Sequence, residues 1–186
     1  MEKAIGIRAK MPDRAFDPGA SKFFGDPAIP EKWLEDFYED EIFFAQIRLS
    51  DIAVLDKENR LPHTGYLYIF LHTAEGGYGL KPDVRYYEGE PTHVFDEFNA
   101  AVDGYEQFAN AWLMEFYETD GQADCTRLFG IPSDWGYGDT PPELLMQFDP
   151  LDASLGFLSE LDGFMYLFFG ENKRDFSGIT AFIERS

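Results

Sequence analysis

Cysteine is almost absent from this sequence, which contains one, Cys125, among 186 residues. A single thiol excludes an internal disulfide and a zinc site built from cysteines, and it is typical of a reducing compartment. The sequence also lacks the apolar core of a signal peptide and any stretch approaching the roughly 18 uncharged residues of a membrane span. We therefore expect a cytoplasmic protein without a membrane-spanning segment.

Basic residues are scarce, with 15 lysines and arginines against 35 aspartates and glutamates, which gives a formal net charge of −20 at pH 7. A charge of this sign repels nucleic-acid phosphates and anionic membrane surfaces, so we expect neither as a direct partner. It favours a basic protein as partner. The alternative is that the acids only keep the protein soluble.

The common signatures of a catalytic site are also missing. The sequence contains no phosphate-binding P-loop, no Gly-x-Ser-x-Gly motif and no dinucleotide-binding fingerprint. Cys125 has no nucleophile signature around it, and the spacing of Asp149 and Asp152, which could pair as acid and base, is common by chance in so acidic a chain. The only histidines are His63, His72 and His93. No two of them have the spacing of metal ligands on a helix, so we expect no catalytic residue, no metal site and no cofactor.

What the sequence does contain is an internal repeat. The segment 24–27 resembles 129–132, 43–47 resembles 144–148, and 65–70 resembles 163–168. Matched positions are Gly25 and Gly130, Gln46 and Gln147, Gly65 and Gly163, and Tyr68 and Tyr166. Ordered matches with slowly drifting offsets indicate an internal duplication with shortened loops. We therefore predict one fused domain over 1–186, with a first repeat at about 22–93, a connecting helix at about 94–118 and a second repeat at about 125–186.

Apolar patterning divides the chain into strands and one helix. Runs with apolar residues on both faces predict strands at 42–49, 65–72, 144–148 and 164–169. Between the repeats, apolar residues recur at intervals of three and four, which is the period of a helix. These residues are Phe95, Phe98, Val102, Tyr105, Ala109, Trp112 and Phe116. We predict an α+β fold, a mostly antiparallel sheet built from the duplication, with one main amphipathic helix between the copies.

The repeat-equivalent glutamines, Gln46 and Gln147, are polar side chains inside predicted strands. A buried amide needs both donors and acceptors, so each glutamine is suited to tying a loop to the sheet. The alternative is a paired ligand site on the axis that relates the repeats.

An acidic run with aromatic neighbours lies between the first two motifs. The residues that we predict to bind a partner are Trp33, Glu35, Asp36, Phe37, Tyr38, Glu39, Asp40 and Glu41. The acids would steer a basic partner, and the aromatic residues would anchor it. The alternative is that the acids are solvated and the aromatic residues point into the core.

The order and spacing of these motifs resemble the YwqG-like family of bacterial proteins. The similarity is carried by 24–30, 44–47, 61–70, 128–132, 144–149, 162–168 and 174–177. It spans about residues 22–183. The resemblance implies a cytosolic protein without an established biochemical activity, and the gene neighbourhoods of some relatives imply immunity against secreted toxins.

These features predict a non-catalytic protein-binding module, in its most specific form an immunity protein that binds a basic toxin domain. The alternative is a small-ligand binder or an enzyme with its site in the cleft between the two repeats. A structural or regulatory adaptor is a third interpretation.

Overall fold

A computed structural model describes residues 3–38, 41–73, 80–101, 106–133, 135–136, 138–149, 151–152 and 164–183. The strands of its main sheet are β1 (Lys3–Lys10), β2 (Lys22–Phe23), β4 (Ile42–Arg48), β5 (Tyr66–Thr73), β6 (Leu80–Tyr87), β8 (Trp112–Asp120), β9 (Arg127–Leu128), β10 (Leu144–Phe148), β11 (Met165–Phe168) and β12 (Thr180–Ile183). A separate two-stranded sheet consists of β3 (Ala28–Ile29) and β7 (His93–Val94). The helical elements are α1 (Leu49–Ile52) and the short 3-10 helices η1 (Glu31–Trp33), η2 (Phe98–Ala101), η3 (Glu106–Ala109) and η5 (Phe176–Gly178).

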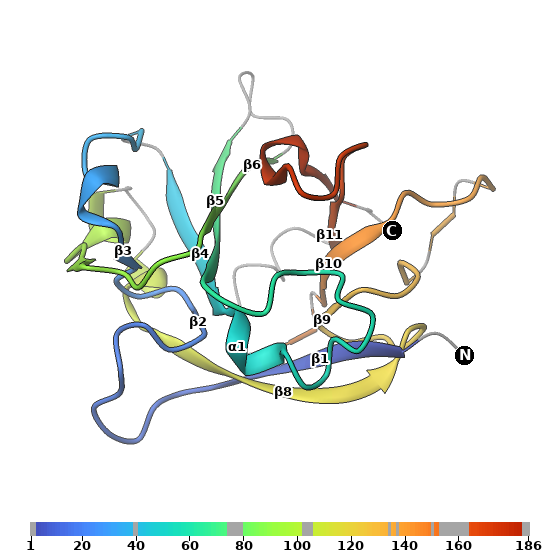
Figure 1. Ribbon diagram of the computed structural model, residues 1–186, viewed down its shortest axis with the longest axis horizontal. Helices are drawn as coiled ribbons and strands as arrows, with labels where there is room; N and C mark the ends of the chain where they lie inside the picture. The colour runs from blue at the N-terminus through green and yellow to red at the C-terminus, as the bar shows by residue number, and fades with distance from the viewer. Residues whose placement is uncertain are drawn as a thin grey trace.

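The main strands form one antiparallel sheet that curls into a nearly closed barrel (Figure 1). Their order is β12-β11-β10-β9-β1-β8-β2-β4-β5-β6. The edge strands β12 and β6 lie close together, and Tyr86 of β6 packs on Phe176 of η5 with ring centroids 5.8 Å apart. The fold is therefore mostly antiparallel sheet, and the predicted α+β class with one main helix is wrong.

The predicted connecting helix is replaced by turns and a strand. Residues 94–118 hold the end of β7, η2, η3 and most of β8, and the only α-helix among the described residues, α1, has four residues. Trp112 and Phe116 lie in β8. Their spacing of four residues does not distinguish a helix from a strand, since it places both side chains on one face in either case. A continuous backbone ladder with β1 decides in favour of the strand. Val102 and Tyr105 lie outside the described residues.

The strands of the repeated motifs lie where the sequence predicts them. β10 has the predicted bounds, and β4, β5 and β11 differ from the prediction by one residue at one or both ends. These strands could be predicted because apolar residues on both faces indicate a strand that is covered on both sides.

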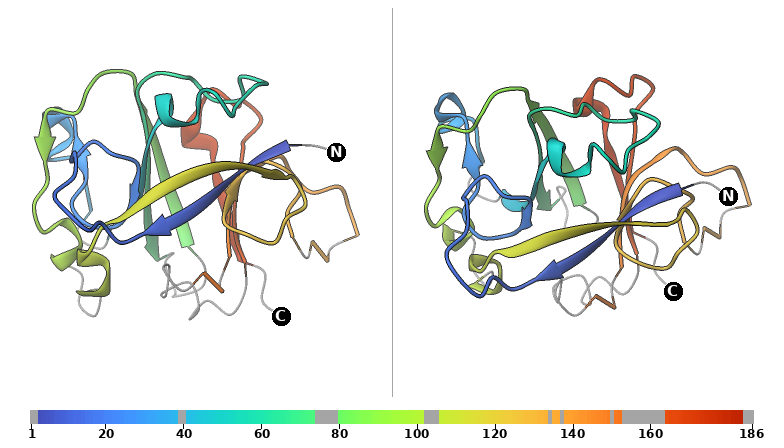
Figure 2. Two further views of the ribbon diagram at one scale, coloured as in Figure 1. Left: turned by 90° about the horizontal axis from the view of Figure 1, so that it is seen from below. Right: turned by 60° about the horizontal axis from the view of Figure 1, so that its bottom comes forward.

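The two halves are related by a pseudo-twofold axis between β1 and β8. Exchanging β1, β2, β4, β5 and β6 with β8, β9, β10, β11 and β12 reproduces the order of the sheet read from its other edge. Figure 2 shows β1 and β8 as one long two-stranded ribbon across both halves. β2 pairs with β8, and β9 pairs with β1. The first strand of each half, β1 or β8, is therefore hydrogen-bonded to the second strand of the other half. The registers place Arg8 opposite its own counterpart, Glu115, on the axis.

The sequence-matched positions occupy equivalent places in this arrangement. Gln46 stands opposite Tyr68 and Gln147 opposite Tyr166, and both ladders have an irregularity at the same point of β4 and β10. Positive φ angles occur at Phe24 and Gly25 in the first half and at Phe129 and Gly130 in the second. Gly163 lies outside the described residues. The repeat limits of 22–93 and 125–186 stay a prediction, although the symmetry also includes β1 and β8, which precede them.

Hydrophobic side chains fill the barrel and also cover the outer face of β4 and β5. Inside, Phe44 meets Phe148 of the other half edge to face, with ring centroids 4.5 Å apart. Outside, Tyr68 and Phe70 of β5 are covered by β3, η1 and η2. No helix in the described part of the chain is both long enough and apolar enough to cross a membrane.

Candidate functional site

The aromatic residues of the acidic run pack on the protein itself. Trp33 meets Tyr68 edge-on with ring centroids 5.3 Å apart, and Phe37 packs on Phe70 at 4.8 Å and on Phe98 at 5.1 Å. Both residues therefore contribute to the cluster that covers β5.

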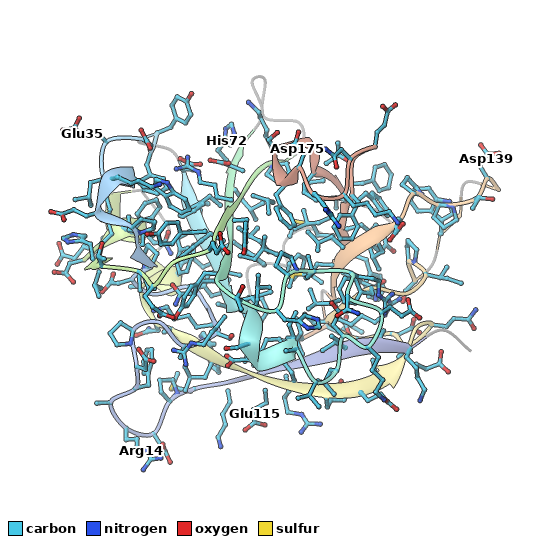
Figure 3. All side chains as sticks on the ribbon, viewed as in Figure 1. Arg14, Glu35, His72, Glu115, Asp139 and Asp175 are labelled. Carbon is cyan, nitrogen blue, oxygen red and sulfur yellow. The ribbon has the colours of Figure 1, made fainter. Side chains whose placement is uncertain are left out.

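The acids of the same run divide between surface and interior. Glu35 and Asp36 are exposed, and Glu35 points outward at one end of the molecule (Figure 3). Tyr38 beside them is 70% exposed. Glu41 is only 2% exposed, and burial raises the pKa of its carboxyl to about 7. Outside the described residues lie Glu39 and Asp40. The structure thus leaves three described members of the predicted partner site on the surface.

The repeat glutamines are fully paired cross-links. Gln46 accepts a hydrogen bond from the Ala28 N–H and donates to the carbonyls of Pro18 and Ala20, all at 2.9 Å. Gln147 makes the corresponding bonds to its own loop in the second half. Since both amide donors are used in each case, these geometries favour the structural interpretation over a paired ligand site.

Lys22, which stands opposite Gln46 in β2, is a charged side chain in the interior. It is 2% exposed, and its Nζ donates one hydrogen bond of 2.8 Å to the carbonyl of Pro18. That carbonyl also accepts from Gln46. Among the described residues Lys22 forms no ion pair, so two of its three ammonium donors lack a protein acceptor there.

The equivalent cation of the second half, Arg127, is buried and held by its own loop. Its guanidinium donates hydrogen bonds to the carbonyls of Ala123 (2.9 Å), Phe129 and Ile131 and to Oε1 of Gln147 (3.2 Å). A cation at this position can therefore serve the fold alone. Within the described part of the chain, Lys22 holds its loop by one hydrogen bond, so two of its three ammonium donors have no role in holding the loop.

The side chain of Lys22 lines a cavity of about 460 Å³. The other lining residues are Met11, Pro12, Phe16, Pro18, Gly25, Asp26, Val94, Ala109, Asn110 and Ala111. They come from the β1–β2 loop, the turn after β2, β7 and the segment before β8. The ring of Phe16 lies 5.5 Å from Nζ of Lys22, within the range of a cation–π contact. The cavity therefore combines mostly apolar walls with one buried donor, a combination typical of small-molecule sites.

Burial lowers the pKa of Lys22 to about 8, and the negative charges of Asp26 and Asp17 partly oppose that shift. About a tenth of the amine is then neutral at pH 7. The site can thus donate hydrogen bonds to a ligand oxygen, and its neutral form can act as a nucleophile.

A second cavity, of about 430 Å³, shares Pro18 and Val94 with the Lys22 cavity. Its polar lining includes Arg48, whose guanidinium pairs with Asp17, and Tyr66, whose hydroxyl donates to Glu90 at 2.7 Å. His93 lies on the same wall. These charged groups mostly satisfy one another, although Nε of Arg48 is buried and has no hydrogen-bond partner among the described residues.

A third cavity, of about 460 Å³, lies between the two halves, where the sequence places the alternative small-ligand site. Glu58 and Arg60 of the first half face residues 130–132 and 140–143 of the second. Its Lys173 forms an ion pair with Glu143. The cationic groups at this cavity already have partners, which makes it a weaker candidate than the Lys22 cavity.

The other residues that could carry chemistry, the histidine His63 and the thiol Cys125, form no catalytic or metal site among the described residues. Nε2 of His63 lies 3.3 Å from Oδ2 of the buried Asp56, but Asp56 also accepts from the backbone N–H groups of Arg60 and Leu61 and so holds a loop. Within the described ranges no group of histidine, cysteine and acidic side chains could hold a metal ion. Cys125 is a free thiol of intermediate exposure.

No family model matches the chain, and no curated protein is significantly similar to it. Lys22 was not singled out from the sequence. The signal for it was present in the repeat, since Lys22 and Arg127 stand two residues before the matched Phe24 and Phe129. No local sequence pattern indicates that a lysine will be buried beside a cavity formed by loops. Only the tertiary structure therefore distinguishes Lys22 from Arg127.

Proposed function

We propose that this protein is a non-catalytic binding protein that holds a small molecule in the cavity lined by Lys22. The observation that carries the proposal is a buried ammonium group with one protein acceptor on the wall of a cavity. Burying a charge without full compensation costs several kcal/mol, and Arg127 proves that this fold can compensate a cation at the same position. A fold that leaves Lys22 only partly compensated is best explained by a ligand that completes its hydrogen bonds.

The chemistry of the cavity restricts that ligand. Lys22 requires an oxygen acceptor, such as a carboxylate or carbonyl group, and the apolar wall around Phe16 and Val94 favours a compact apolar body. This site replaces the cleft between the halves as the location of the small-ligand alternative.

The test is an NMR titration of the ¹⁵N-labelled protein with benzoate, benzamide and benzyl alcohol. We expect saturable shifts at the backbone amides of Phe16, Lys22, Asp26 and Asn110 with benzoate or benzamide, and weaker or no shifts with benzyl alcohol. K22M should abolish them. K81M is the matched control, because Lys81 is exposed and its substitution changes the net charge equally. The proposal fails if no probe gives saturable shifts at the cavity in the wild type.

A second candidate function, capture of a basic protein, rests on the net charge of −20 and on the exposed Glu35, Asp36 and Tyr38. Immunity against a toxin, the YwqG-like resemblance and a cytoplasmic location remain predictions that accompany this candidate. A basic partner recovered from the native host at low salt would associate more slowly with the double variant E35Q/D36N. E115Q on β8, on another side of the molecule (Figure 3), is the control. An acidic partner, or an association rate insensitive to salt, would eliminate this candidate.

A further inference from the structure

We infer that Lys22 forms a reversible imine with a small aldehyde bound in its cavity. The inference rests on the proposed function, because it specifies the class of ligand that the cavity holds. It depends on the position of Lys22, on the apolar walls and on the carboxylate that shares the cavity.

The position of Lys22 sets it apart from every other lysine in the chain. The other six are Lys3, Lys10, Lys32, Lys57, Lys81 and Lys173, all exposed. Lys22 is the only one of the seven that is buried, it lines a cavity with mostly apolar walls, and it has no carboxylate at ion-pair distance in the described structure. An ammonium that is tightly paired with an acid stays protonated, whereas one with a single carbonyl acceptor loses little when it becomes a neutral amine.

The lowered pKa of Lys22 supports the same conclusion, since a larger fraction of its amine is the nucleophilic form near neutral pH. The charged groups that face it are Asp26 and Asp17, and both favour the ammonium. Burial outweighs them.

Asp26 provides the proton relay that imine formation requires. Asp26 is one of the residues that line the cavity, and its Oδ1 accepts a hydrogen bond of 2.8 Å from the Glu97 N–H, which fixes its orientation. In the first step the neutral amine of Lys22 attacks the carbonyl carbon, and a proton passes from nitrogen to oxygen to give a carbinolamine. In the second step the hydroxyl leaves as water and the second amine proton is lost, so that amine and aldehyde yield imine and water. The Asp26 carboxylate accepts each proton from nitrogen and returns it to oxygen.

The charge of the site favours a neutral carbonyl compound over an anion. A carboxylate ligand would pair with Lys22, but it would enter a cavity that holds Asp26 on a protein with a net charge of −20. An aldehyde carries no charge to repel, and its oxygen can accept a hydrogen bond from Lys22 before reaction.

The test is reductive trapping of the full-length wild type with benzaldehyde and sodium cyanoborohydride at pH 7, followed by peptide mapping of the benzylated lysines. We expect Lys22 to be labelled at least about tenfold faster than any exposed lysine, because a lower pKa increases the neutral fraction more than it decreases nucleophilicity. D26N should slow the labelling of Lys22 and leave the other lysines unchanged, even though loss of the Asp26 charge lowers the pKa of Lys22 further and enlarges its neutral fraction. The decisive comparison is among lysines of one folded protein, so it does not depend on any variant.

The outcomes separate this inference from the proposed function. If benzamide or benzoate binds the cavity but Lys22 is labelled no faster than the exposed lysines, the imine inference is wrong and the binding function stands. If no probe binds and Lys22 is unlabelled, both are wrong. Labelling of Lys22 that D26N leaves unchanged would overturn the relay assigned to Asp26.

Discussion

Replacing Lys22 by methionine should leave the protein as stable as before or make it more stable. Methionine matches the length of the lysine stem and needs no hydrogen bond. The carbonyl of Pro18 keeps its bond from Gln46, so the substitution leaves no buried acceptor unpaired. If Lys22 were a structural residue, its loss would instead destabilise the fold, as we expect for Arg127.

The magnitude follows from the pKa of Lys22. The folded value of about 8 lies below the ordinary value of 10.5, so folding disfavours the charged form. The difference corresponds to about 3 kcal/mol at pH 7, and the lost hydrogen bond offsets about 1 kcal/mol of it. K22M should therefore raise the free energy of unfolding by about 2 kcal/mol at pH 7. The stability of the wild type should rise relative to K22M as the pH increases from about 8 to 10.5, because the unfolded chain then binds more protons.

Urea unfolding followed by tryptophan fluorescence at pH 7, 8, 9 and 10 measures this difference. K81M reports the effect of changing the net charge alone. R127M should decrease the free energy of unfolding by about 3 kcal/mol or more, because loss of the guanidinium leaves the carbonyls of Phe129 and Ile131 without their hydrogen bonds from Arg127. A loss of more than about 1 kcal/mol in K22M at pH 7, or a pH dependence equal to that of the wild type, would refute the assignment of Lys22 to a ligand.

Three further outcomes test the fold itself. The pKa of Glu41 is raised to about 7 from 4.5, so its contribution to the free energy of unfolding is fully present below pH 4.5 and is lost as the pH rises through 7. In urea denaturation, the free energy of unfolding of E41Q should therefore exceed that of the wild type by about 3 kcal/mol at pH 8 and equal it at pH 4. G65A should destabilise by about 2 kcal/mol or more in the same assay, because Gly65 has a φ of 79° and an added Cβ would lie 2.3 Å from the Tyr87 carbonyl oxygen. Fragments 1–101 and 106–186 should each lack near-UV circular dichroism alone and regain it on mixing, since β2 and β9 each pair with a strand of the other half.

Local patterning was sufficient for the strands of the repeated motifs and insufficient for the element between them. β4 and β10 carry apolar residues on both faces, and such a run has few alternatives to a buried strand. β8 carries Trp112 and Phe116 at a spacing that a strand and a helix share. Its identity depends on pairing with β1, more than 100 residues earlier in the chain, and no local pattern contains that information.

The candidate site illustrates a similar limit. The acidic run is visible in the sequence through its density of charge, and Gln46 is visible through the repeat. The buried acid Glu41 belongs to that run, yet it lies in the interior because it directly precedes β4, a strand that is buried along nearly its whole length. The Lys22 cavity is assembled from segments near residues 11–26, 94 and 109–111, which only the folded chain brings together.

The difference between the two halves explains why the site lies in the first. The loop between β8 and β9 is short, and its Ala123 carbonyl accepts directly from Arg127. The corresponding loop between β1 and β2 is longer and supplies Met11 and Phe16 as cavity walls while its Pro18 gives Lys22 a single acceptor. The same position in a duplicated fold therefore binds its own loop in one half and faces a cavity in the other. Because one core joins both halves, the second half can stabilise the fold while the first tolerates a cation that is only partly compensated. A ligand site at Lys22 requires this condition.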